Sequence, residues 1–352
     1  MSRLVIISAG PATTVQDQGR SGVQRYGLPP SGAMDQASLA IANCLVENPP
    51  LGAAIEIGPF GAVLSARQGA VRVALAGASR KAEIAGQPVD FNRTLVIGDT
   101  EELRLGPVRD GVFSYLAIEG GIAGKPVFGS VAVNARAGLG SPFPRNLQAG
   151  DAFETGDIRA LHAERKFDRP AADNSPIRVV LGPQDDEFEA PTLALLLESD
   201  WSVSSASDRM GYRIEGPRLV HTRGHNIISD GTVTGSIQVP GSGQPIVLMA
   251  DRGTTGGYPK IATVISADIG RLAQKRIGEP FRFRAVSVDE AQLEARRFDS
   301  FLASLPRQIS EIDAVALNIA ALQNANLAGV AVNAIDAATW QQTTIEQGKT
   351  PS

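Results

Sequence analysis

Charged side chains gather between glycines in residues 13–35, TTVQDQGRSGVQRYGLPPSGAMD, just before an apolar segment begins. Asp17, Arg20, Ser31 and Asp35 all lie in this stretch. Glycine lets a backbone come close to a ligand and turn its amides toward it. Arginine adds a planar pair of donors that suits carboxylate or carbonyl oxygens. This composition is typical of the wall of a binding site as well as of a connecting loop.

A second stretch, ADRGTTGGYPKIATVISADIGRLAQ (250–274), has a similar composition. The apolar run PIVLMA ends at the charged pair Asp251 and Arg252, and the glycine-rich loop GTTGGYP follows. Charged residues at the end of a rigid strand are a common place for a site. The spacing alone leaves a second interpretation open, because an Asp-Arg pair can also simply staple a loop of a barrel.

The segment EGGIAGKP (119–126) resembles a phosphate-binding loop only superficially. The Walker pattern requires glycine where Glu119 stands and a hydroxyl residue where Pro126 stands. Without that hydroxyl there is no magnesium ligand, and the acid would repel a phosphate. We therefore expect a β-turn after the strand YLAI, and no nucleotide site in this chain alone.

Other catalytic motifs are weak or missing. His221 and His225 are four residues apart, a spacing that could hold zinc on a helix, but glycine and β-branched neighbours favour a strand and turn. We expect no metal site. No G-x-S-x-G motif occurs, which argues against a serine hydrolase of that class. No Met-Lys dipeptide occurs either, so the chain carries no biotinyl-lysine of the usual kind.

The bulk composition excludes several classes of function. The 352 residues are 43% hydrophobic and 20% charged, with a formal net charge of −4, so nucleic acid and anionic membranes are poor partners. The single cysteine, Cys44, fits a reducing compartment. The first ten residues predict a strand rather than a signal peptide, and no window of 18 apolar residues occurs. We expect a cytoplasmic protein.

The pattern along the chain predicts a mainly β protein with a few helices. Short β-branched or alternating runs separated by glycine turns favour barrels or sandwiches over a parallel sheet. We expect a helix capped by Asp35 up to about Glu47, another over residues 190–200, and a short one capped by Ser266. Apolar residues at helical spacing from residue 289 onward, including 310–330, predict a helical tail. The polar segment 162–176 is the expected seam between two main units.

Three long stretches identify a family. Residues 13–46, the segment YLAIEGGI and residues 235–274 closely resemble the family called allophanate hydrolase subunit 2. This family is also known as the KipA or biotin-dependent carboxyltransferase family, and it includes the C subunit of 5-oxoprolinase. The resemblance covers roughly residues 3 to 288. The sequence LVENPP departs from the usual LVGN at the end of the first helix.

The resemblance implies two β-barrel subdomains of cyclophilin-like architecture. They would be a carboxyltransferase-like unit at 1–165 and a second barrel at 166–288, followed by the helical tail at 289–352. It also implies that the chain works as part of an enzyme. The first hypothesis is the C subunit of an ATP-dependent 5-oxoprolinase-type complex, which opens the lactam of 5-oxoproline to glutamate. The partners would be a KipI-like B subunit and a LamB/YcsF-type A subunit.

Two alternatives remain. One is a carboxyltransferase component of the urea carboxylase type, in which carboxybiotin gives its carboxyl to urea or a related amide. The other is a KipA-like regulatory partner of a KipI-type kinase inhibitor. Only the carboxyltransferase alternative involves carboxybiotin; in the first hypothesis the complex uses ATP, and this chain alone binds no cofactor.

Both chemistries act on a poorly reactive amide or urea group. Arginines and backbone amides can stabilise the developing oxyanion, and a carboxylate can act as a base or orient the nucleophile. The family match gives the positions of the catalytic candidates Asp17, Arg20, Asp251 and Arg252. The substrate-binding candidates in the same two stretches are Ser31, Asp35, Thr255, Gly256, Gly257 and Tyr258.

Overall fold

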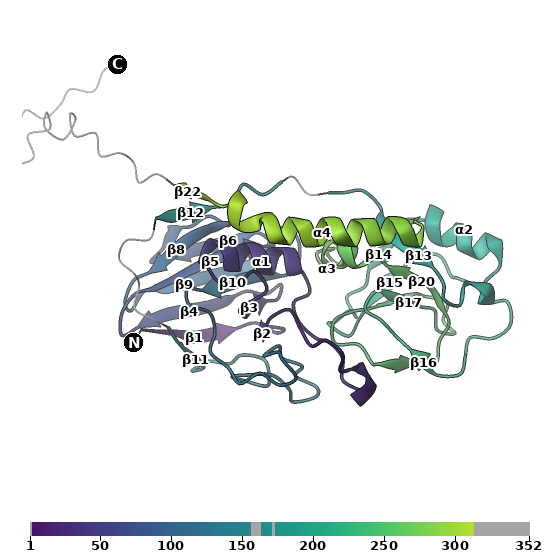
Figure 1. Ribbon diagram of the computed structural model, residues 1–352, viewed down its shortest axis with the longest axis horizontal. Coiled ribbons are helices and arrows are strands. Elements are labelled where there is room, and N and C mark those ends of the chain that lie inside the picture. The colour runs from purple at the N-terminus through teal and green to yellow at the C-terminus, as the bar shows by residue number, and fades with distance from the viewer. Residues whose placement is uncertain (1, 156–162, 171–172, 313–352) are drawn as a thin grey trace, which may run out of the picture. The chain divides into compact units, whose positions relative to one another are not determined.

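A pair of antiparallel sheets forms the first part of the molecule (Figure 1), in a computed structural model that describes residues 2–155, 163–170 and 173–312. The first sheet has the strand order β11-β1-β4-β9-β6-β7: Ala152–Glu154, Arg3–Ala9, Ala62–Arg67, Glu102–Val108, Arg80–Ile84 and Gln87–Pro88. The second has the order β2-β3-β10-β5-β8-β12-β22: Thr14–Gln16, Ala54–Ile57, Ser114–Ile118, Val71–Gly77, Arg93–Ile97, Glu164–Lys166 and Ser310–Ile312.

Alternating side chains explain how these sheets pack. In β1, Leu4 and Ile6 are fully buried, while Arg3 is exposed. In β10 both faces are buried: Leu116 joins the core between the two sheets, and Tyr115 joins the next core along the molecule. Both faces of this central strand are covered, so its side chains either pack in a core or form hydrogen bonds. The strand β10 therefore separates two hydrophobic cores.

A third sheet, residues 177–285, forms the second part. Its order is β14-β15-β18-β17-β20-β13-β21: Ser202–Val203, Gly211–Glu215, Ile246–Leu248, Ser236–Gln238, Lys260–Val264, Ile177–Leu181 and Phe283–Ala285. A separate two-stranded ribbon joins β16 (Asp230–Gly231) to β19 (Thr255–Gly256). The mainly β class with few helices is confirmed.

Four α-helices lie in the described residues: α1 (Gln36–Leu45), α2 (Ala190–Glu198), α3 (Ile269–Ala273) and α4 (Val288–Gln308). Three 3-10 turns accompany them: η1 (Gln24–Tyr26), η2 (Asp185–Glu187) and η3 (Ser266–Asp268). The helix α1 packs on β5 and β10, where Ala74 and Ala76 leave room for it. The long α4 contacts α1 and β13, and Figure 1 shows it running along one side of both parts. None of the described helices is long and apolar enough to cross a membrane.

The helix predictions had mixed outcomes. Asp35 caps α1 as expected, since its side chain accepts from the backbone of Ser38. The helix predicted at 190–200 is confirmed as α2. Ser266 was wrongly predicted as a cap: it begins the 3-10 turn η3, and its side chain makes no capping bond.

The predicted C-terminal helices also need one correction. The first is confirmed as α4, which continues through Pro306 to Gln308 and belongs to the compact unit that ends at Glu311. The second prediction was wrong at its start, because Ser310–Ile312 form the strand β22. The rest of that predicted helix lies outside the described residues.

Candidate functional site

The structure brings the two glycine-rich stretches together. The backbone N–H of Ser31 donates to the carbonyl of Ala250 over 3.0 Å. The side chain of Gln24 accepts from Arg252 Nη2 at 3.2 Å and donates to the carbonyl of Thr254 at 3.3 Å. These contacts place residues 13–35 beside the strand end that carries Asp251. We call this region the junction.

Asp17 organises the backbone of the junction. Its Oδ1 accepts from the Gly19 N–H at 2.8 Å and from the Ser130 hydroxyl at 2.6 Å. Its Oδ2 accepts from the Val131 N–H at 2.8 Å. Asp17 is buried, and both of its oxygens are occupied. The carboxylate therefore holds two loops in place.

Arg20 is only partly satisfied by the protein. The residue is 3% exposed, and Nε and Nη2 donate to the carbonyls of Val127 at 3.2 Å and Ala132 at 2.5 Å. Nη1 is buried and has no hydrogen-bond partner among the described residues. Burial lowers the pKa of Arg20, and the charges of Asp17 and Asp251 oppose this shift. Arg20 thus lies near Asp251 and keeps one donor free.

Asp251 belongs to a buried chain of ion pairs that the sequence interpretation missed. Arg209 Nε lies 2.9 Å from an oxygen of Asp251, and Nη1 lies 2.5 Å from an oxygen of Glu56. Arg209 Nη2 also donates to the carbonyl of Gly32 at 2.8 Å. Burial alone would lower the pKa of Arg209, but the charges of Glu56 and Asp251 outweigh it and raise that pKa. Arg209 links the two parts of the molecule.

A sequence signal for this chain of ion pairs does exist. Glu56 is the one charged residue in the apolar run AAIEIGPF, and it is completely buried. A charge in a buried strand needs a partner. Besides Arg209, Glu56 accepts from the Tyr115 hydroxyl at 2.7 Å and from the Met34 N–H at 2.9 Å. Burial, followed by the nearby charges of Glu56 and Asp35, raises the pKa of Tyr115 well above its usual value.

Arg252 is buried and forms no ion pair with a carboxylate of the described residues. It is 3% exposed, and Nη1 donates to the Thr234 hydroxyl at 2.9 Å. Nη2 makes longer contacts, 3.2 Å to Gln24 Oε1 and 3.4 Å to the carbonyl of Thr232. Nε is buried and has no partner in the described part of the chain. Burial lowers the pKa of Arg252 to about 10.

Ser31 and Asp35 have different surroundings. Ser31 adopts a left-handed backbone conformation with φ of 55°, and its hydroxyl accepts from Asn134 at 3.3 Å. Asp35 lies farther along, where its carboxylate caps α1 and accepts from Gln274 Nε2 at 2.9 Å. Ser31 is thus part of the junction, whereas Asp35 serves the start of a helix.

The residues Thr255 to Tyr258 form the ribbon with β16 and the turn after it. Gly256 pairs with Asp230, and a side chain there would collide with Gln238, since an added Cβ would overlap the Nε2 atom of Gln238. The Gly257 carbonyl accepts from the Ile227 N–H at 2.9 Å. Gly256 therefore serves close packing, whereas a Cβ at Gly257 would meet only ordinary contacts of 3.6 Å or more. Tyr258 is 39% exposed, so its ring is accessible from solvent.

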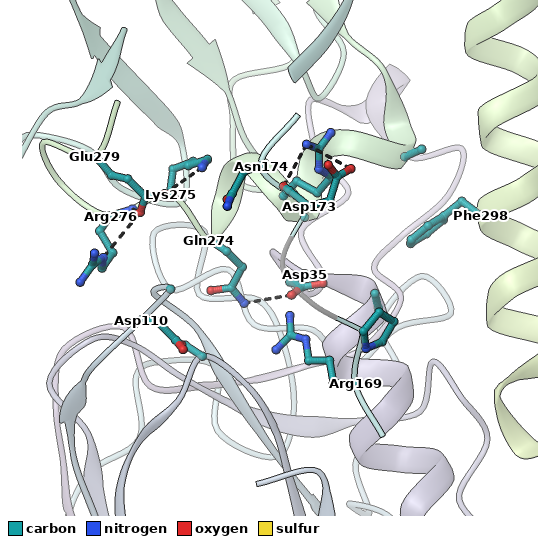
Figure 2. A pocket seen from close by; sticks show the side chains of 17 residues that line it. Asp35, Asp110, Arg169, Asp173, Asn174, Gln274, Lys275, Arg276, Glu279 and Phe298 are labelled. Atoms are coloured by element: carbon teal, nitrogen blue, oxygen red, sulfur yellow. Dashed lines mark hydrogen bonds and ion pairs between the residues drawn. The ribbon is translucent and has the colours of Figure 1, made fainter. Parts of the chain in front are cut away.

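A pocket of about 570 Å³ is lined by Asp35 but by none of the other predicted site residues (Figure 2). Figure 2 shows the Asp35 carboxylate bonded to Gln274 at its base, with Arg169 and Asp110 nearby. Gln274 Oε1 accepts two backbone N–H groups, from Val112 at 2.8 Å and Phe113 at 3.0 Å. Of the ten predicted site residues, Asp35 is the one that lines this pocket in the described structure. The pocket and the junction are therefore separate features.

The two histidines lie close together without forming a metal cluster. The ring centroids of His221 and His225 are 6.4 Å apart, and His221 Nε2 donates to the carbonyl of Val239 over 2.9 Å. Within the residues that the structure describes, no group of three or more His, Cys, Asp or Glu side chains could hold a metal ion.

Comparisons with known proteins agree on one family. The model of the carboxyltransferase domain, subdomains A and B, matches residues 26–285. The chain belongs to this family. It is 38% identical to the C subunit of 5-oxoprolinase from Escherichia coli (strain K12), over 84% of this chain and 94% of the relative. It is 34% identical to the C subunit of 5-oxoprolinase from Haemophilus influenzae, over 87% of this chain and 98% of the relative.

Solved structures extend this likeness. The crystal structure of the K. lactis urea amidolyase matches with a TM-score of 0.77 and 25% identity, over 86% of this chain and 20% of that chain. The present chain thus spans about a fifth of the urea amidolyase. The family resemblance expected from the sequence is confirmed by the family model and by the 5-oxoprolinase relatives.

Proposed function

We propose that this protein is the C subunit of an ATP-dependent 5-oxoprolinase-type complex that opens the lactam of 5-oxoproline to glutamate. The observation that carries the proposal is the match to two 5-oxoprolinase C subunits along 94% and 98% of their own lengths. Such coverage leaves little of those relatives unmatched. The proposed partners are a KipI-like B subunit and a LamB/YcsF-type A subunit.

The geometry of the junction suggests a division of roles. Arg20 has a buried, unpartnered Nη1, which could donate to the charge that develops on the amide oxygen. Asp17 and Asp251 act as positioning residues in this proposal, because backbone N–H groups, a hydroxyl and Arg209 occupy their oxygens. A catalytic base then has to come from another group, and the partner proteins are the proposed source.

ATP in this proposal is used by the complex, outside this chain. Residues 119–121 form a turn after β10, in which the Gly121 N–H donates to the carbonyl of Ile118 over 2.9 Å. The residues that follow, 122–126, are not helical, whereas a Walker loop leads directly into a helix. The segment therefore does not fit a nucleotide.

Reconstitution tests the proposal. The purified chain alone should not convert 5-oxoproline in the presence of ATP, and addition of the KipI-like and LamB/YcsF-type partners should give turnover. The readouts are glutamate formed and ATP hydrolysed, with each mixture of two proteins as a control. Strong ATP-dependent turnover by this chain alone, or no turnover by the full mixture, would overturn the proposal.

A second candidate function has one observation in its favour. The likeness to urea amidolyase supports carboxyl transfer to urea or a related amide, with a separate biotin carrier supplying carboxybiotin. Biotin-dependent carboxylation of urea by the chain with a carrier and a biotin carboxylase would select this alternative. Tight binding to a KipI-like protein without either activity would select the regulatory alternative.

A further inference from the structure

The guanidinium of Arg252 has an unusual environment among the buried arginines of the described structure. Four arginines are at most 4% exposed: Arg20, Arg72, Arg80 and Arg252. Arg72 forms an ion pair with Glu119, and Arg20 lies in the field of Asp17 and Asp251. Arg80 donates from all three nitrogens to neutral acceptors. Arg252 has neither an ion pair nor a full set of acceptors among the described residues.

The least satisfied donors of Arg252, Nε and Nη2, lie on one edge of the guanidinium. Nη1 is bonded to Thr234, but Nε has no partner in the described residues, and Nη2 makes contacts of 3.2 Å and 3.4 Å to neutral oxygens. The Nε and Nη2 donors are parallel, and together they match the two oxygens of a carboxylate. A buried charge without a partner is costly. An arginine in this state suits a ligand that brings the missing negative charge.

We propose that the Nε–Nη2 edge of Arg252 binds the carboxylate of the substrate, and that the Gln24 side chain occupies part of this site when substrate is absent. The inference rests on the proposed function and names the substrate class within it. A cyclic amide that carries a carboxylate fits the edge. Urea and simple amides carry no negative charge and would leave the guanidinium uncompensated.

Gln24 is the partly exposed side chain through which a ligand could reach Arg252. Gln24 lies on η1, a turn of three residues, none of which is buried. Its amide oxygen accepts from Arg252, and its amide nitrogen donates to the carbonyls of Thr232 at 2.6 Å and Thr254 at 3.3 Å. Rotation of this one side chain uncovers the Nη2 end of the edge. Each lost amide bond can be replaced by water, because Gln24 is at the surface.

The first test changes the charge of Gln24 itself. Gln24→Glu places a carboxylate within reach of Arg252 and supplies the counter-charge from the protein. Gln24→Glu and Gln24→Met both lose the amide donor to the carbonyls of Thr232 and Thr254, and only Gln24→Glu adds a counter-charge. We therefore expect the Tm of Gln24→Glu to exceed that of Gln24→Met by about 2 °C or more. Arg25→Gln controls for charge at an exposed position of the same turn. A Tm of Gln24→Glu at or below that of Gln24→Met would overturn the proposal.

The second test measures binding to the full chain by calorimetry. The probes are 5-oxoproline, pyrrolidin-2-one (the same ring without the carboxylate), urea and inorganic phosphate. We expect 5-oxoproline to bind about 10- to 100-fold more tightly than pyrrolidin-2-one, the range for a charge-assisted bond. Gln24→Glu and Arg252→Lys should lose most of this preference, and Arg25→Gln should keep it.

Each other outcome counts against the site. Equal affinity for the two ring compounds, binding of none of the probes, or phosphate competing as well as 5-oxoproline would overturn it. These measurements need no partner protein, so they are independent of turnover. If the carboxylate preference is present and the full complex is inactive, only the proposed function fails. If turnover is present and the preference is absent, only the Arg252 site fails.

Discussion

Arg80 and Arg252 are buried to nearly the same degree but differ in how many of their guanidinium nitrogens have hydrogen-bond partners. Arg80 is 4% exposed and Arg252 is 3% exposed, and burial lowers the pKa of each to about 10. Arg80 Nε donates to the Ser114 hydroxyl at 2.9 Å, Nη1 to the carbonyl of Gly106 at 3.2 Å and Nη2 to that of Gly58 at 3.0 Å. Arg252 has an Nε without a partner among the described residues and weaker contacts at Nη2.

The difference separates a structural arginine from a candidate binding arginine. Burial and a lowered pKa are common to both residues, so neither property identifies a site here. Satisfaction of the donors does distinguish them, since Arg80 connects β6, β9 and the end of β3, whereas the Nε of Arg252 has no acceptor among the described residues. Arg209 is a third case, in which two carboxylates compensate the charge fully. Variants of these arginines test the distinction.

Arg209→Met should have the largest effect. The buried Glu56 and the partly buried Asp251 would lose their cation, and breaking a buried ion pair from one side costs about 3–5 kcal/mol. Urea unfolding should show this loss at pH 7. Arg209→Lys, which keeps the charge, should lose less; equal losses in both variants would contradict the ion-pair interpretation.

Arg20→Lys should have the next largest effect, and it should appear in turnover. Lysine keeps the charge but cannot present Nη1 to an oxyanion while holding Val127 and Ala132. The loss of one donor to the developing charge costs about 2.7–4 kcal/mol, a factor of roughly a hundred to a thousand in kcat. The assay is the reconstituted complex, with Arg25→Lys as a control on the same loop. A kcat within threefold of wild type, at equal stability, would remove Arg20 from the catalytic candidates.

Arg80→Met should reduce stability without a specific effect on turnover. Three backbone carbonyls and a hydroxyl lose their donor, but the cost of burying the charge disappears as well. The net loss should be about 2 kcal/mol in urea unfolding. Turnover per folded, assembled molecule should be unchanged. A specific loss of kcat in this variant would show that the distinction between Arg80 and Arg252 is wrong.

Much of the fold and part of the junction could be predicted from the sequence. The β-strands and the Asp35 cap follow from local patterns that act over short distances, and the charged, glycine-rich composition of residues 13–35 and 250–258 indicated the two stretches of the junction. The partners of those residues could not be predicted, because they come from distant segments. Asp17 binds Ser130 and Val131, and Asp251 binds Arg209, contacts that only the tertiary structure creates.

One error has a physical cause of this kind. Ser310–Ile312 begin a segment with apolar residues at helical spacing, yet a short segment that can extend a sheet gains hydrogen bonds that an isolated helical turn lacks. Gly256 and Gly257 stay predicted substrate-binding residues, and Gly256 in addition allows close packing against Gln238. Glycine indicates close approach without saying whether a ligand or the protein's own backbone comes near.

Asp35→Asn should have the smallest effect, and it extends the comparison to carboxylates. Asp35 Oδ1 accepts from the Ser38 N–H at 3.1 Å, and Oδ2 accepts from the Ser38 hydroxyl at 2.5 Å and from Gln274 Nε2 at 2.9 Å. Asparagine keeps the capping bond but turns an amide donor toward Gln274. Stability should fall by about 1 kcal/mol in urea unfolding, with KM for 5-oxoproline within about twofold of wild type. Like Arg80, Asp35 already has hydrogen-bond partners within the protein, so we expect it to contribute little to substrate binding. A KM raised more than about tenfold at unchanged stability would instead restore Asp35 as a substrate-binding residue.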